Sequence, residues 1–159
     1  MKRTAWIGLA LALAAGSLAP DLRADTDERL RRNVELVIDT SGSMNDRNKI
    51  GDAKRALAKF LANVPDDTNI GLIVFDGGQP KRVLPLAKFD RAKMATVVES
   101  LQAAGGTPIN DSVVMALQSL KEQRERQGGY GTYSVVVVTD GEDTGNKAAL
   151  PNTVKEVVA

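Results

Sequence analysis

The chain runs Val34-Glu35-Leu36-Val37-Ile38 and continues Asp39-Thr40-Ser41-Gly42-Ser43-Met44. The first segment is short, apolar and rich in β-branched residues, which is typical of a strand covered on both faces. The second places a carboxylate and two hydroxyls at alternate positions on the loop that leaves this strand, so the three side chains can turn toward one point. Hard oxygen ligands that converge in this way suit a small hard cation such as Mg²⁺.

Two later segments offer oxygen ligands to the same place. They are Gly105-Gly106-Thr107-Pro108 and Val138-Thr139-Asp140-Gly141, and the second of them ends an apolar run. Taken alone, each of the three segments is ordinary turn or capping chemistry at the end of a strand or the start of a helix. Their occurrence together and in this order favours a metal site instead. Its candidate ligands are Asp39, Ser41, Ser43, Thr107 and Asp140.

Apolar runs and helical periodicity alternate along the rest of the chain. The apolar runs predict strands over residues 34–38, 69–75 and 133–139, with a weaker edge strand over residues 81–86. Apolar residues at helical spacing predict helices over residues 49–64, 91–101, 110–127 and 150–158.

This alternation predicts an α/β fold, with a doubly wound, mostly parallel sheet flanked by helices. Ligands bind such sheets beyond the carboxyl ends of the strands. The loops at Asp39 and Asp140 can meet there if the first and fourth strands are neighbours. We therefore expect that strand order.

The pattern Asp-x-Ser-x-Ser, followed by a Thr and then an Asp, resembles the metal-ion-dependent adhesion site of the von Willebrand factor type A domain. Every position of that pattern is matched here without substitution, and the resemblance extends from about Asn33 to the end of the chain. Residues 38–44 and 139–143 place the chain nearer to the bacterial members than to the animal adhesion receptors. The resemblance implies a Rossmann-like sheet of order 3-2-1-4-5-6, and a domain that takes an Asp or Glu from a partner protein.

Each candidate ligand has an expected role. We expect Ser41, Ser43 and Thr107 to bind the ion through their hydroxyls. Asp39 and Asp140 are expected to act mostly through bound waters and hydroxyls. Neutral nearest ligands would leave the ion most of its charge and one open position, which a carboxylate of the partner fills well. Hydroxyl ligands on a tight loop favour Mg²⁺, with Ca²⁺ or Mn²⁺ as alternatives.

The first 24 residues have the pattern of a secretory signal. Their apolar run, residues 5–18, follows a basic start and is too short to cross a bilayer comfortably. Cleavage is expected after Ala24, and an uncleaved membrane anchor is the alternative. Residues 25–32 then form a charged lead-in, and residues 33–159 form the domain. The expected location is periplasmic or extracellular, with membrane contact only if the N-terminal segment stays uncleaved.

The family pattern continues beyond the fourth strand with two more strands and a closing helix, whereas this sequence ends at Ala159. We therefore expect a domain that is incomplete at its C-terminus and lacks its last two strands. The fourth strand, which is almost all valine, would then be an exposed edge that is prone to aggregation. The alternative is a partner strand that covers this edge.

Composition narrows the possible chemistry. The 159 residues include 21 Lys and Arg, 20 Asp and Glu, and neither His nor Cys. Zinc sites of His and Cys, thiol catalysis, Ser-His triads and disulfides are therefore excluded. No basic stripe with interleaved aromatic residues points to a nucleic-acid partner.

These observations predict a binding module and not an enzyme. Its expected function is that of an exported, adhesion-type module that recognises an acidic residue of a partner protein through Mg²⁺. One alternative is a mainly structural component of a cell-envelope assembly. Another is a magnesium-dependent hydrolase that uses Asp39 as nucleophile or base, although the second Asp of phosphatases of the haloacid-dehalogenase type is replaced here by Ser41.

Overall fold

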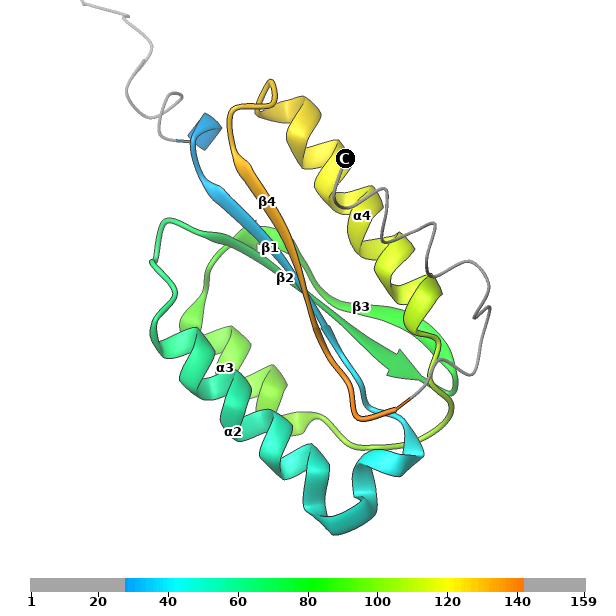
Figure 1. Ribbon diagram of the computed structural model, residues 1–159. Coiled ribbons are helices and arrows are strands. Elements are labelled where there is room, and N and C mark those ends of the chain that lie inside the picture. The colour runs from blue at the N-terminus through cyan, green and yellow to red at the C-terminus, as the bar shows by residue number, and fades with distance from the viewer. Residues whose placement is uncertain (1–27, 142–159) are drawn as a thin grey trace, which may run out of the picture.

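The computed structural model describes residues 28–141 of the chain (Figure 1). Its strands are β1 (Arg32–Ile38), β2 (Asn69–Asp76), β3 (Gln79–Lys88) and β4 (Thr132–Val138). Its helices are the 3-10 segment η1 (Gly42–Asn48), α2 (Lys49–Ala62), α3 (Arg91–Ser100) and α4 (Ile109–Arg126). The predicted signal sequence with its cleavage after Ala24, and the helix predicted over residues 150–158, lie outside the described residues.

The four strands form one sheet in the order β3-β2-β1-β4. β1 is parallel to both of its neighbours, and Ile38 is paired with Val74 of β2 on one side and with Val138 of β4 on the other. β3 is antiparallel to β2 and lies at the opposite edge. The structure thus confirms that the first and fourth strands are neighbours and that the third is an edge strand.

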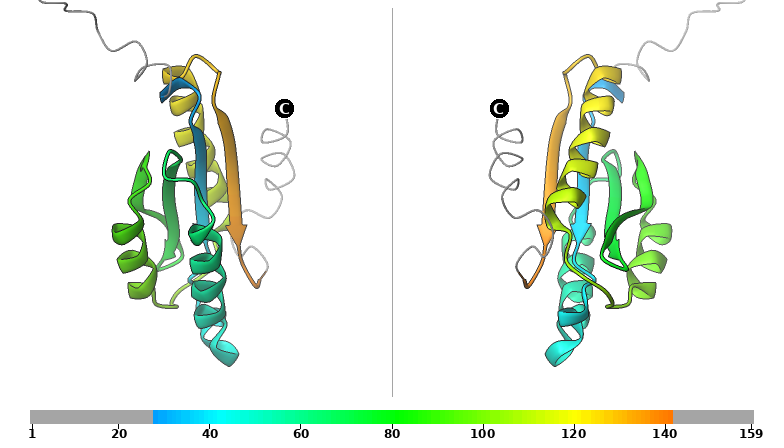
Figure 2. Two further views of the ribbon diagram at one scale, coloured as in Figure 1. Left: turned by 90° about the vertical axis from the view of Figure 1, so that its left-hand side faces the viewer. Right: turned by 90° about the vertical axis from the view of Figure 1, so that its right-hand side faces the viewer.

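Helices cover both faces of this sheet (Figures 1 and 2). One core lies beneath α2 and α3, where strand residues such as Leu36 and Leu72 pack against Leu57 and Val98. The other core lies beneath α4 and includes Val37, Ile73, Phe75, Ile109, Val113 and Ala116. Successive residues of a strand point to opposite faces, and consecutive apolar residues such as Leu36, Val37 and Ile38 of β1 are all buried because helices cover both faces. This is the predicted doubly wound α/β architecture.

Two details differ from the sequence-based prediction. β3 is longer than the predicted 81–86, because its ladder with β2 continues to the turn, where Asp76 is paired with Gln79. The loop after β1 contains the 3-10 segment η1, which has no apolar periodicity to reveal it. Within residues 28–141, no helix is both long enough and apolar enough to span a membrane.

Candidate metal site

Three loops meet at the carboxyl ends of β1 and β4. Backbone hydrogen bonds fasten the loop after β1 to the other two: Asp39 N to Val138 O at 2.8 Å, Ala104 N to Thr40 O at 2.7 Å, and Gly42 N to Gly105 O at 2.9 Å. The loop is therefore bound on one side to the end of β4 and on the other side to the segment that precedes α4. This joins the three sequence segments that carry the candidate ligands.

Asp39 is the buried anchor of the site, with 0% of its surface exposed. Its Oδ1 accepts a hydrogen bond from the backbone nitrogen of Ser41 at 2.7 Å, and its Oδ2 accepts one from the Thr139 hydroxyl at 2.5 Å. Both carboxylate oxygens thus have protein donors, one on each loop. This arrangement supports a role for Asp39 in orienting the ligand loops.

A chain of polar side chains runs from this anchor to the surface. The hydroxyls of Ser41 and Ser43 lie 3.1 Å apart, and the Ser43 hydroxyl donates to Asp140 Oδ1 at 3.1 Å. Ser41 is buried and Ser43 is exposed, whereas Asp140 is exposed as a whole residue but its side chain is only 17% exposed. The residues of this chain come from the loops after β1 and β4, which are far apart in the sequence.

Thr107, the fifth candidate ligand, is buried in the loop that leads into α4. It follows two residues after Gly105, whose carbonyl accepts the hydrogen bond from Gly42. The structure therefore places Thr107 on the loop that is bonded to the serine-bearing segment. The other four candidates are joined to one another by hydrogen bonds.

Gly105 lies where the loop before α4 approaches the β2–β3 turn. Its φ is +79°, and a Cβ at this position would lie 2.8 Å from the backbone nitrogen of Gly78 and 3.0 Å from Cα of Gly77. Such a contact with backbone atoms cannot be relieved by rotating a side chain. This close approach gives a packing reason for glycine at position 105.

We expect Gly105→Ala to lower the free energy of unfolding by about 2–3 kcal/mol, because it combines left-handed strain with a backbone clash. Gly77→Ala is the matched control: Gly77 has a φ of +60° but open space around it, so its loss should be only about 1 kcal/mol. Guanidinium unfolding measures both values. Equal losses in the two variants would show that the contact with Gly78 is unimportant.

Lys49, the first residue of α2, contributes a positive charge to the site. Its Nζ donates a hydrogen bond to Asp140 Oδ2. This bond is the main reason that the pKa of Asp140 lies below its usual value, with a smaller lowering from Ser43. The carboxylate of Asp140 is thus held between a hydroxyl on one oxygen and an ammonium on the other.

Sequence reasoning missed three polar residues of this region. Lys49 and Thr139 were not among the residues predicted for the site, although Lys49 contacts Asp140 and Thr139 contacts Asp39. Thr40 was also overlooked: its hydroxyl donates to Phe75 O at 2.5 Å and accepts from Phe75 N at 3.1 Å, which ties the loop to β2. Both threonines adjoin a predicted ligand at the end of a strand, and this position could have indicated that they belong to the site.

The donor set fits a hard divalent cation. Within residues 28–141, no three Asp, Glu, His or Cys side chains are grouped so that they could hold a metal. An ion at this site would therefore depend on hydroxyl and water oxygens together with Asp39 and Asp140. Such an all-oxygen set suits Mg²⁺ or Mn²⁺ better than a metal that prefers nitrogen or sulfur.

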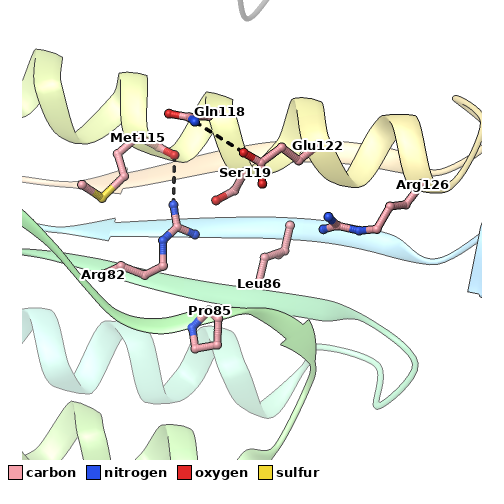
Figure 3. Close-up of a pocket in the computed structure, with 8 residues that line it drawn as sticks. All are labelled: Arg82, Pro85, Leu86, Met115, Gln118, Ser119, Glu122 and Arg126. Atoms are coloured by element: carbon pink, nitrogen blue, oxygen red, sulfur yellow. Dashed lines mark hydrogen bonds between the residues drawn. The ribbon is translucent and has the colours of Figure 1, made fainter.

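A second polar feature lies away from these loops, between β3 and α4. Glu35 is 0% exposed, and its Oε1 accepts a hydrogen bond from Arg82 Nη1 at 2.8 Å. Arg82 also donates to the Met115 carbonyl of α4 at 3.1 Å (Figure 3). Burial raises the pKa of Glu35, although the nearby Ser119 hydroxyl and Arg82 oppose this rise. The guanidinium thus pairs with a buried carboxylate in β1 and connects β3 to α4.

Arg82 lines a cavity of about 440 Å³ between β3 and α4. Its other lining residues include Pro85, Met115 and Ser119 (Figure 3). None of the predicted metal ligands lines it.

Comparison with known proteins identifies the family of this fold. A family model for the von Willebrand factor type A domain matches residues 34–142. Inter-alpha-trypsin inhibitor heavy chain H4 of Homo sapiens is 34% identical over 136 residues, which make up 80% of this chain and 14% of that protein. The chain thus spans only a small part of the length of this relative.

Solved structures show the same fold at low sequence identity. The manganese-loaded TRAP protein of Plasmodium vivax superposes with a TM-score of 0.65 and 18% identity, over 81% of this chain and 54% of that chain. The pilus adhesin SpaC of Lactobacillus rhamnosus GG gives a TM-score of 0.60 and 23% identity, over 72% of this chain and 16% of that chain. With the family model matching most of its length, the chain belongs to the von Willebrand factor type A domain family.

Proposed function

We propose that this chain is an exported, metal-dependent protein-binding module of the adhesion type, which recognises an Asp or Glu of its partner through Mg²⁺. The observation that carries the proposal is the hydrogen-bonded chain of Ser41, Ser43 and Asp140, anchored on the buried Asp39 at the ends of β1 and β4. Thr107, on the adjoining loop, is the proposed third hydroxyl ligand. Export rests on the signal pattern of residues 1–24.

The chemistry of the ligands explains why a partner carboxylate is the expected target. Hydroxyl ligands are neutral, so an ion held by Ser41 and Ser43 would keep most of its positive charge. A carboxylate that approaches from the exposed side, where Ser43 and Asp140 lie, would complete the coordination. Two proteins with this fold, a pilus adhesin and a protein solved with manganese, give independent support.

Binding fits the geometry of Asp39 better than catalysis does. A hydrolase that used Asp39 as nucleophile would need one of its oxygens to be accessible to substrate. Here Asp39 is fully buried, and both oxygens accept hydrogen bonds, from Ser41 and Thr139. We infer that this carboxylate is a structural part of the site.

Titration calorimetry of the purified protein with Mg²⁺ and Mn²⁺ tests the metal site. We expect saturable binding by the wild type, and an affinity about 10- to 100-fold weaker for Asp39→Asn, because this acid orients the loops that carry the ligands. Asp67→Asn, which changes an exposed Asp on the loop before β2, is the matched control and should bind as the wild type does. A folded wild type that binds neither ion would refute the proposal.

A peptide array then tests the partner chemistry. Peptides that contain Asp or Glu should be retained in the presence of Mg²⁺ and released by excess chelator, whereas matched Asn and Gln peptides should not be retained. Retention that survives the chelator would show that the binding does not depend on a metal ion.

A further inference from the structure

The two oxygens of Asp140 face different donors. Oδ1 accepts from Ser43, which belongs to the hydroxyl chain, whereas Oδ2 accepts from Lys49 of α2. The Lys49 side chain is 38% exposed and that of Asp140 is 17% exposed. The ammonium is thus bonded to a candidate metal-site carboxylate on the oxygen that does not accept from Ser43.

The position of Lys49 in its helix is unfavourable in the absence of Asp140. A helix N-terminus carries a partial positive charge, so a cation in the first turn is repelled. Lys49 is the first residue of α2, and it follows two non-glycine residues, Arg47 and Asn48, with φ values of 51° and 59°. Asn48 provides no side-chain cap for the helix. The ion pair with Asp140 offsets the unfavourable charge.

We propose that Lys49 is a fixed positive charge that lowers the affinity of the site for a divalent ion and makes the ion-bound site more attractive to a carboxylate. The inference rests on the proposed metal site. Asp39, Asp140 and Lys49 together carry a formal charge of minus one, so a divalent ion leaves the site at plus one. Without the ammonium, the same site would bind the ion more tightly and would then be neutral.

Titration of Lys49→Met with Mg²⁺ and Mn²⁺ tests this inference. Removal of a unit charge from the immediate surroundings of the ion should tighten binding on the order of tenfold at low ionic strength. The side chain is partly exposed, so added salt should screen the effect. We therefore expect the difference from the wild type to shrink between ~0.02 M and ~0.5 M NaCl.

Two further variants separate charge from other effects. Lys49→Arg keeps the charge and should bind the ions as the wild type does. Lys59→Met removes a lysine from the same helix about 15 Å farther along its axis, and should also leave the affinity unchanged. Thermal unfolding of each variant confirms that it is folded before the affinities are compared.

The outcomes for this inference and for the proposed function are distinct. Equal affinities of the wild type and Lys49→Met would overturn the inference and leave the metal site intact. Weaker binding by Lys49→Met would also overturn it, because Lys49 would then support the ion by positioning Asp140. Failure of the folded wild type, Lys49→Met and Lys49→Arg to bind either ion would overturn the proposed function and the inference together.

Discussion

Thr40→Val should lower the free energy of unfolding by about 3–4 kcal/mol, since it removes two hydrogen bonds and leaves buried groups unpaired. The Thr40 hydroxyl donates to the carbonyl of Phe75 and accepts from its backbone N–H, and both residues are buried. Valine has nearly the same shape but can satisfy neither group. Urea or guanidinium unfolding of the variant beside the wild type measures the loss.

Thr40→Ser is the matched control because it keeps the hydroxyl and removes only a methyl group. It should lose about 1 kcal/mol, the value expected for one buried methyl. The same two variants should differ in Mg²⁺ affinity, because Thr40 fastens the loop that carries Ser41 and Ser43 to the end of β2. If Thr40→Val and Thr40→Ser had equal free energies of unfolding, the hydroxyl would contribute nothing to the attachment of the loop.

Arg82→Met should lower the free energy of unfolding by about 3–5 kcal/mol near neutral pH, because it removes the partner of a buried charge. Glu35 is fully buried, and Oε2 already lacks a hydrogen-bond partner among the described residues. Without the guanidinium, the folded protein must either hold an unpaired carboxylate or bind a proton. Methionine keeps much of the apolar stem of the arginine, so the loss reports mainly on the charge.

Arg82→Met should also make the free energy of unfolding depend more strongly on pH, with stability falling as the pH rises. Burial already raises the pKa of Glu35 in the folded wild type above its ordinary value of 4.5. A raised pKa contributes stability that is complete below the unfolded pKa and is lost as the pH rises through the folded pKa. Removal of Arg82 raises the folded pKa further. The loss in Arg82→Met should therefore grow as the pH is increased from about 4.5 toward neutrality.

A double variant isolates the carboxylate. Glu35→Gln combined with Arg82→Met has no charge at either position and should show little of this extra pH dependence. Chemical unfolding of the wild type, Arg82→Met and the double variant at several pH values measures this dependence. A loss in Arg82→Met that is constant across this range would show that Glu35 does not bind a proton when its partner is removed.

The positions of the strands and of the candidate site follow from local patterns in the sequence, whereas the full strand order was implied by the resemblance to the type A domain. Apolar runs with β-branched residues locate β1, β2 and β4, and carboxylates and hydroxyls at strand ends locate the candidate site. Because the strands are parallel, Asp39 and Asp140 must both lie at the carboxyl ends of their strands on the same side of the sheet. The parallel pairing of β1 with β4 confirms this. Each strand and each candidate ligand can be predicted from a single short segment, and their meeting follows from a general rule of α/β sheets.

The polar pairs could not be predicted in this way because they depend on tertiary contacts. Lys49 and Asp140 are 91 residues apart in the sequence, and Glu35 and Arg82 are 47 residues apart. Glu35 is a charged residue within an otherwise apolar run of the sequence, but the run does not indicate which residue pairs with it. The positive φ values of Arg47 and Asn48, just before α2, could not be predicted either, because apolar periodicity gives no information about the backbone of residues outside the helix.

The pairing of β1 with β4 has a consequence for how the domain folds. Ile38 and Val138 are 100 residues apart in the sequence, whereas the β2–β3 hairpin joins Asp76 to Gln79 across a tight turn. Contacts between distant residues require the closure of a long loop and slow the folding of a domain, whereas local hairpins form quickly. The candidate metal site combines loops from both β1 and β4. We therefore expect it to be assembled late, with its ligand loops brought together only when the chain has nearly reached its native topology.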